Sequence, residues 1–221
     1  MSQTAKASRT KTKDGVARRK LAQQERSQQR VEHILSTTLS MLSEGPAEDV
    51  TTRKIAARAQ VSVGSIYQFF PNKEALYYEL FKRWLTQTLA ALDSLIAQIP
   101  EESGPDDVET HVEAFLQTMS APKLNSPANW RLRLAMSSSH KLTELENRHR
   151  LEIAQRLLKM RSRFGKLPPP SIAQELFLLQ NEVTIACLYT LSRTQPANRA
   201  PIQDLCTSLV LRVFAFDGWA E

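Results

Sequence analysis

The sequence predicts an all-α protein of about nine helices. Apolar residues recur at intervals of three and four along most of the 221-residue chain, which is the spacing of one face of a helix. Glycine and proline interrupt this pattern at several points and separate one expected helix from the next. No stretch alternates apolar and polar residues as a strand would, and no segment repeats at a fixed period.

Four helices are expected in the first hundred residues. Gly45 and Pro46 end the first of them. Thr51 and Ser62 suit the N-cap positions of two short helices, because a side-chain oxygen there can accept a backbone N–H of the first turn. Asn72 can cap a long fourth helix in the same way.

Five more helical patterns fill the rest of the chain, at residues 106–120, 127–138, 141–164, 171–193 and 200–216. The last two are apolar on more than one face, so each must be buried on several sides. Two interpretations stay open for this pair. It can form the centre of a core, or it can form half of a four-helix interface between two copies of the chain.

Positive charge is concentrated at the N-terminus. Residues 1–30 hold nine Lys and Arg against two Asp and Glu, whereas the whole chain has a net charge of +6. A basic arm on a near-neutral body is typical of proteins that bind polyanions, although a solubilising tail has the same composition. Residues 1–22 contain almost no large apolar side chain, so we expect a basic, flexible arm there.

The composition argues against several classes of protein. Two cysteines, Cys187 and Cys206, cannot build a disulfide framework, and we expect both to be core thiols. No apolar run approaches the roughly 18–20 residues of a membrane span. The four histidines lack metal-ligand spacing, and no nucleophile motif or Gly-rich phosphate loop is present. We therefore expect a cytoplasmic protein that is not an enzyme, with no catalytic residue, metal, cofactor or membrane partner.

The two short helices and their tight turn predict a helix-turn-helix. In this motif the first helix braces against the DNA backbone and the second lies in the major groove. Gly64 and Ser65 are small enough to let the second helix approach closely. Arg53 and Gln68 can make paired hydrogen bonds to guanine and adenine, respectively. The candidates for donors to phosphate oxygens are Ser62, Ser65, Tyr67 and Lys73.

Residues 30–76 resemble the DNA-binding signature of the TetR family, above all in the stretch TTRKIAARAQVSVGSIYQFFPNKEAL at 51–76. The resemblance implies a three-helix DNA-binding domain followed by a larger helical domain that binds a small effector and dimerises. The expected division is 1–22 for the arm, 23–74 for the DNA-binding domain and 75–221 for the effector-binding and dimerisation domain. The predicted DNA-binding residues are Thr51, Thr52, Arg53, Ser62, Val63, Gly64, Ser65, Tyr67, Gln68 and Lys73.

Two positions depart from that signature. Gln60 stands where the turn usually has glycine, so we expect a non-glycine residue at positive φ, at a cost of roughly 1 kcal/mol. Phe69 stands where tyrosine or histidine is common, so one phosphate contact is expected to be missing. The charge of the basic arm can compensate for that loss.

The sequence therefore predicts a sequence-specific transcriptional regulator, most simply a repressor that a small-molecule effector releases from its operator. Its expected partners are double-stranded operator DNA and a second copy bound through the two C-terminal helices. The candidate residues of an effector pocket, each of which also fits as plain core, are Phe115, Met119, Trp130, Leu134 and Tyr189. Two alternatives remain: an architectural DNA binder without an effector, and a helical enzyme or carrier that keeps a DNA-binding head.

Overall fold

The computed structural model describes residues 11–137, 139–165 and 167–217, with side chains from residue 23 onward. This part of the chain contains nine α-helices and no strand, which confirms the predicted all-α fold. The helices are α1 (Lys11–Glu44), α2 (Thr52–Arg58), α3 (Val63–Phe69), α4 (Lys73–Ala97), α5 (Val108–Met119), α6 (Pro127–Met136), α7 (His140–Arg161), α8 (Pro170–Arg193) and α9 (Arg199–Phe214). Three short 3-10 helices, η1 (Ala47–Asp49), η2 (Pro105–Asp107) and η3 (Pro196–Asn198), lie in the connections.

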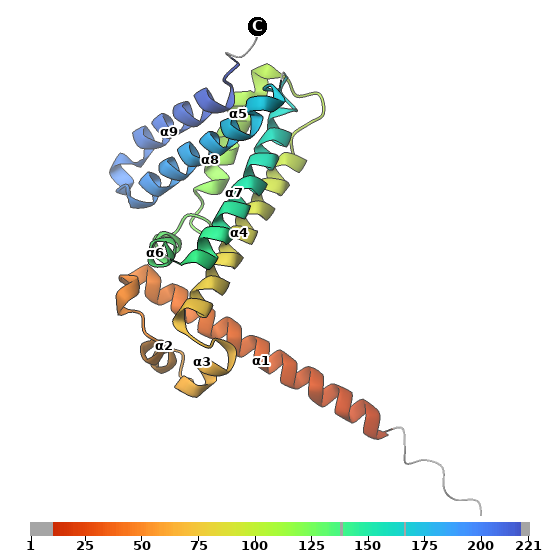
Figure 1. Cartoon of the computed structure of the whole chain (residues 1–221), viewed down its shortest axis with the longest axis vertical. Helices are drawn as coiled ribbons and strands as arrows, with labels where there is room; N and C mark the ends of the chain where they lie inside the picture. Colours follow the sequence, from red (N-terminus) through yellow and green to blue (C-terminus); the bar gives the residue numbers. More distant parts are fainter. Residues whose placement is uncertain (1–10, 138, 166, 218–221) are drawn as a thin grey trace, which may run out of the picture.

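The beginning of α1 differs from the sequence prediction. Residues 11–22 were expected to be a flexible arm, but α1 begins at Lys11 and runs without a break to Glu44. Eight of these twelve residues are Lys, Arg, Ala or Leu, which have good helix propensity, so the packed half of α1 can be extended toward the N-terminus at little cost. In Figure 1 this N-terminal part of α1 extends away from the rest of the molecule. Residues 1–10 lie outside the described residues.

Helices α1, α2 and α3, the first half of α4 and α6 enclose one hydrophobic core, the N-terminal core. Its fully buried members include Ile34, Leu42, Ile55, Ile66, Leu76 and Leu132. Burying a side chain of this size stabilises the fold by about 1.5–3 kcal/mol. These contacts hold the two short helices α2 and α3 against the longer ones.

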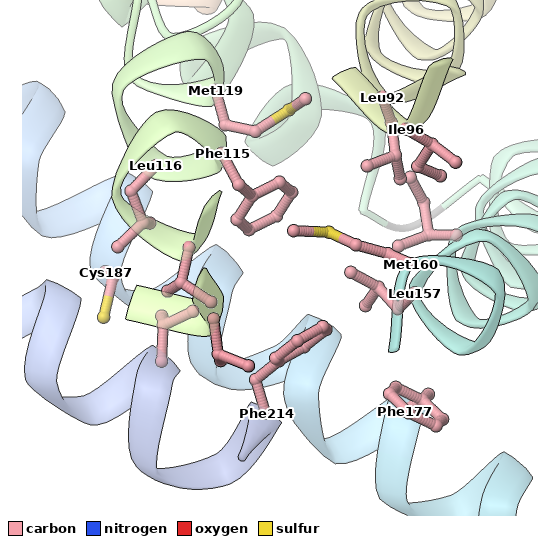
Figure 2. Close-up of a cluster of buried hydrophobic side chains, with 14 of the residues drawn as sticks. Leu92, Ile96, Phe115, Leu116, Met119, Leu157, Met160, Phe177, Cys187 and Phe214 are labelled. Atoms are coloured by element: carbon pink, nitrogen blue, oxygen red, sulfur yellow. The ribbon is translucent and has the colours of Figure 1, made fainter. Parts of the chain in front are cut away.

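A second core, the C-terminal core, lies among the second half of α4, α5, α7, α8 and α9. Figure 2 shows Phe115 of α5 and Met160 of α7 pointing toward each other at its centre, with Leu92 and Ile96 of α4 beside them. The same helix α4 therefore contributes to both cores, through Leu76 to Leu85 at one end and through Leu92 and Ile96 at the other.

Helix α6 also joins the two parts of the chain. It belongs to the part of the chain that was predicted to be the second domain, residues 75–221. Its apolar face nevertheless packs into the N-terminal core through Ala128, Leu132 and Met136. Next to them, Nη1 of Arg131 donates a 2.7 Å hydrogen bond to the carbonyl oxygen of Leu42 at the end of α1. The division at residues 74 and 75 stays a prediction, and α4 and α6 both cross it physically.

Helices α8 and α9 pack against each other and have two different apolar faces. The inner face is buried in the C-terminal core and includes Phe177, Cys187 and Phe214. The outer face leaves large apolar side chains exposed, among them Leu179, Leu205 and Leu209. Cys187 and Cys206 are both buried and free, as predicted, and the sulfur of each lies 3.9–4.0 Å from the other's carbonyl oxygen. None of the helices in the described residues is both long enough and apolar enough to cross a membrane.

Candidate DNA-binding surface and effector pocket

The first helix of the predicted helix-turn-helix is set by its cap and its buried face. Thr51 is the N-cap of α2, and its hydroxyl accepts a 3.2 Å hydrogen bond from the backbone N–H of Lys54. Ile55 and Ala56 are buried in the N-terminal core. Arg53 points to the opposite side and is exposed, as a residue that reads DNA must be.

The turn after α2 closes with a hydrogen-bond pattern that needs a left-handed residue. The N–H of Val61 donates to the carbonyl of Ala56 at 3.0 Å, and the N–H of Gln60 donates to Ala57 at 3.3 Å. This is the Schellman arrangement, in which the residue after the C-cap takes a positive φ. Gln60 has a φ of 53°, which confirms the prediction for this position. Glycine would adopt that conformation without a Cβ clash.

Ser62 starts the second helix, α3, as predicted. Its hydroxyl accepts a 3.1 Å hydrogen bond from the N–H of Ser65, and the two hydroxyl oxygens lie 2.8 Å apart. Ile66 is fully buried and fixes the inner face of α3. On the outer face Tyr67 is 51% exposed and Gln68 is exposed. The segment that begins at Ser62 therefore presents its polar side chains to solvent.

Nine of the ten predicted DNA-binding residues lie together on α2, α3 and their caps. Thr51, Arg53, Ser62, Gly64, Tyr67 and Gln68 are exposed, and Thr52, Val63 and Ser65 are partly buried. The hydroxyls of Tyr67 and Thr52 lie 3.3 Å apart and link the two helices on this surface. A Cβ added to Gly64 would meet only the Ser62 hydroxyl, at 3.8 Å, so this end of α3 is open to a close approach.

Lys73 is the exception. It stands at the first turn of α4, partly buried, and its ammonium group donates to the carbonyl oxygen of Ala47 at 3.3 Å. The same group lies 5.2 Å from the centre of the Tyr77 ring. Burial raises the pKa of Tyr77 to about 12 and its hydroxyl also donates to Ala47. Lys73 thus ties α4 to the connection before α2, and its phosphate contact stays a prediction.

The sequence model for the family described as bacterial regulatory proteins, tetR family, matches residues 34–80, which cover α2, α3 and their flanking helices. Residues 34–80 are therefore a tetR-family segment.

Two curated relatives each match part of the chain. The regulator EthR of Mycobacterium tuberculosis is 30% identical over 91 residues, which are 41% of this chain and 42% of EthR. The repressor KstR of Mycolicibacterium smegmatis is 43% identical over 49 residues, or 22% of this chain and 24% of KstR. The match therefore spans less than half the length of these curated relatives.

A solved structure has a similar arrangement of helices over most of the chain. A tetR-family transcriptional regulator from Streptomyces coelicolor superposes with a TM-score of 0.62 at 16% identity, over 85% of this chain and 80% of that one. At this identity the likeness concerns the arrangement of helices.

A cavity of about 80 Å³ lies between α4, α5, α6, α7 and α8. Phe115, Met119 and Trp130 line it, together with Trp84 and Phe81 of α4. The other two predicted pocket residues lie elsewhere, because they occupy the outer side of α6 and α8. Leu134, 73% exposed, and Tyr189 border an open groove of about 860 Å³.

Trp130 separates the cavity from this groove. Its ring borders both spaces and meets the Tyr189 ring edge to face, with centroids 5.2 Å apart. Its indole N–H donates a 2.6 Å hydrogen bond to Oδ1 of Asn125. Trp130 shares this position with Arg133 and Ile185, which also line both spaces.

The cavity has a polar end that the sequence analysis missed. It is lined by Arg133, Glu146, His149, Arg150 and Asn181. Arg133 pairs with Glu146, and Arg150 pairs with Glu182. The available signal was His149 within the apolar stripe of residues 142–164, and Asn181 within the apolar helix 171–193. Polar residues on buried helix faces often mark a site.

Burial lowers the pKa of His149 to about 4, and the charges of Arg156 and Arg133 lower it further in the same direction. His149 is therefore neutral at physiological pH. The described residues contain no group of three His, Cys, Asp or Glu side chains that could hold a metal ion. Hydrogen bonding, charge and apolar contact are the chemistry that this cavity offers.

Proposed function

We propose that this chain is a sequence-specific DNA-binding transcriptional regulator that acts without catalysis. The observation that carries the proposal is the exposed outer face of α3, where Tyr67 and Gln68 face solvent while Ile66 anchors the helix in the core. A recognition helix needs this division between a rigid inner face and a free outer face. The name of KstR as a transcriptional repressor supports repression as the mode of action.

The DNA-binding surface offers two kinds of contact. Arg53 and Gln68 can make the paired hydrogen bonds that distinguish guanine and adenine in the major groove. The hydroxyls of Ser62, Ser65 and Tyr67 can donate to phosphate oxygens, which fixes the position of the helix without reading the bases. The ten DNA-binding residues predicted from the sequence form the proposed surface, and it would act in the cytoplasm, where bacterial DNA lies.

The proposed active form is a homodimer through the outer face of α8 and α9. Leu179, Leu205 and Leu209 are 54%, 55% and 46% exposed on this face. Large apolar side chains grouped on one surface indicate a surface that a partner covers. A two-fold dimer would place two copies of α3 on successive turns of a palindromic site, roughly 34–36 Å apart.

The proposed control is release of DNA when a small molecule enters the cavity. Two helices connect the cavity to the DNA-binding surface: α4 contributes to both cores, and α6 lines the cavity with Trp130 while Arg131 binds the end of α1. A ligand that fits better when these helices shift would change the population of the DNA-binding arrangement. The same coupling requires operator DNA to weaken ligand binding by an equal factor.

Footprinting of purified protein on fragmented genomic DNA tests the proposal. We expect protection of a few short palindromic sites, with the protein dimeric in solution. Leu205→Glu should weaken both the dimer and the protection, whereas Lys159→Glu, at an exposed position of α7, should leave both intact. Uniform binding to all fragments would instead support an architectural DNA binder, and absence of DNA binding would support an enzyme or carrier.

A further inference from the structure

Two hydrogen-bond donors at the polar end of the cavity have no acceptor. Nε of Arg150 and Nδ2 of Asn181 are buried, and neither has a hydrogen-bond partner among the residues that the structure describes. Both side chains line the cavity. Asn181 is only 7% exposed. Buried donors without partners are rare because each loses its hydrogen bonds to water, so this pair indicates a place for a ligand atom.

The chemistry of the two groups shows what kind of ligand atom can bind them. A side-chain amide can present either its oxygen or its NH₂ group, but the Nε–H of arginine is a donor in every conformation. Nε of Arg150 can therefore be paired only with an acceptor atom of the ligand. Asn181 can donate a second hydrogen bond to the same group. A carboxylate has two acceptor oxygens and makes charge-assisted hydrogen bonds to arginine.

The charged side chains around this end are paired with one another. The carboxylates of Glu146 and Glu182 are already paired with Arg133 and Arg150. Nearly two turns further along α7, Arg156 is paired with Asp93 and Glu152. Burial is the main cause of the lowered pKa of His149, and the charges of Arg156 and Arg133 act in the same direction. The choice of an acceptor for the ligand head therefore rests on the two donors without partners.

The other end of the cavity is apolar and aromatic. Trp84, Trp130, Phe115 and Met119 form its walls. The space of about 80 Å³ is smaller than a known apolar protein cavity of roughly 150 Å³ that binds benzene. The apolar body of a ligand must therefore be compact, and a ring-sized body requires Trp130 to move toward the outer groove.

We propose that the cavity binds a compact amphiphile with an apolar body and a carboxylate head, the head accepting hydrogen bonds from Nε of Arg150 and Nδ2 of Asn181. The inference rests on the proposed function, for which it names the class of effector. In this proposal the ion pairs Arg133–Glu146 and Arg150–Glu182 position the two arginine side chains at the polar end.

Binding to the full-length protein without DNA tests the proposal. Calorimetric titration would compare hexanoate, phenylacetate and 3-phenylpropionate, each with the alcohol and the amine of the same carbon skeleton. We expect each acid that fits to bind at least about tenfold more tightly than its alcohol, the factor of one charge-assisted hydrogen bond. Equal or tighter binding of the alcohols or amines would overturn the proposal, as would the absence of binding by all three acids.

Two variants and two controls locate the head group. Asn181→Leu removes one donor at nearly constant volume, and Arg150→Lys keeps the charge beside Glu182 but removes Nε. Each should reduce the preference for acid over alcohol by about tenfold. Asn147→Leu and Arg148→Lys, at exposed positions of α7, the helix that carries Arg150, should leave the preference for acid over alcohol unchanged. An unchanged preference in Arg150→Lys would overturn the assignment even if Asn181→Leu does not fold.

A parallel gel-shift measurement separates this inference from the proposed function. If an acid binds as expected and lowers operator affinity, both stand. If an acid binds but DNA affinity stays the same, the ligand class stands and the proposed release of DNA fails. If DNA binding is specific but no acid binds, the regulator proposal stands and the ligand class is wrong.

Discussion

Trp84 of α4 and Trp130 of α6 meet edge to face in the wall of the cavity, with ring centroids 5.8 Å apart and planes at 75°. Each ring belongs to a helix that continues into the N-terminal core. The indole N–H of Trp84 also donates a 2.7 Å hydrogen bond to the carbonyl of Leu124, in the segment that leads to α6. This pair therefore joins α4 and α6 at the wall of the cavity.

Trp84→Phe should weaken this link without emptying the cavity wall. It removes the indole donor, whereas the Leu124 carbonyl keeps its 3.1 Å hydrogen bond from Asn129. We expect the free energy of unfolding, measured with urea, to fall by about 1–2 kcal/mol. Tyr189→Phe, which changes an exposed hydroxyl, should alter it by less than about 0.5 kcal/mol. Equal stability of Trp84→Phe and the unmodified protein would show that this hydrogen bond contributes nothing.

Gln60→Gly should stabilise the protein. The left-handed conformation of Gln60, with φ at 53°, costs a non-glycine residue roughly 1 kcal/mol. Glycine removes this cost, but its greater freedom in the unfolded chain offsets part of the gain in stability. We expect a small rise in the midpoint of thermal unfolding. Gln60→Ala keeps the Cβ clash and should give no rise. A lower midpoint for the glycine variant would contradict the assigned strain.

His149 should make the protein less stable in mild acid. Its pKa is lowered from 6.5 to about 4 in the folded state, so below pH 6.5 the unfolded chain binds a proton that the folded chain does not. The free energy of unfolding therefore falls as the pH drops from about 6.5 to about 4. His149→Gln should flatten the curve in that window, whereas His140→Gln, at a side chain 87% exposed, should not. Parallel curves for all three proteins would refute the assignment.

The thiols of Cys187 and Cys206 should be inert in the native protein. Both residues are buried, and burial raises the pKa of Cys187 to about 12. Thiolate, the reactive form, is therefore scarce at pH 8. Titration with Ellman's reagent should detect no rapidly reacting thiol in the folded protein and two per chain in guanidinium chloride. Rapid reaction of either thiol in the native state would contradict their assignment as buried core thiols.

The local features of the fold could be predicted from the sequence because they depend on near neighbours. Thr51, Ser62 and Asn72 are N-caps as expected, and apart from the start of α1 the expected bounds of the helices lie within a few residues of the observed ones. The positive φ of Gln60 followed from its place in a recognised turn. These features need only the order of residues along one or two turns.

The features that could not be predicted depend on packing between distant helices. Leu134 and Tyr189 are apolar and fit a pocket by composition, but the orientation of α6 and α8 places them on the groove side of Trp130. Arg150 and Asn181 meet at the polar end only because α7 packs against α8. Residues 11–22 were predicted to be a flexible arm because they are polar. A polar segment can still extend an existing helix when most of its residues have good helix propensity, and α1 begins at Lys11.

Selection from a library of random duplex DNA tests the central claim most directly. The protein should recover a palindromic consensus with half-sites one helical turn apart. Arg53→Ala and Gln68→Ala should each relax the preference at particular bases by about 1–3 kcal/mol, whereas Lys73→Ala should weaken binding to all sequences alike. Recovery of no consensus, or an equal loss from all three substitutions, would contradict the claim that α3 reads DNA.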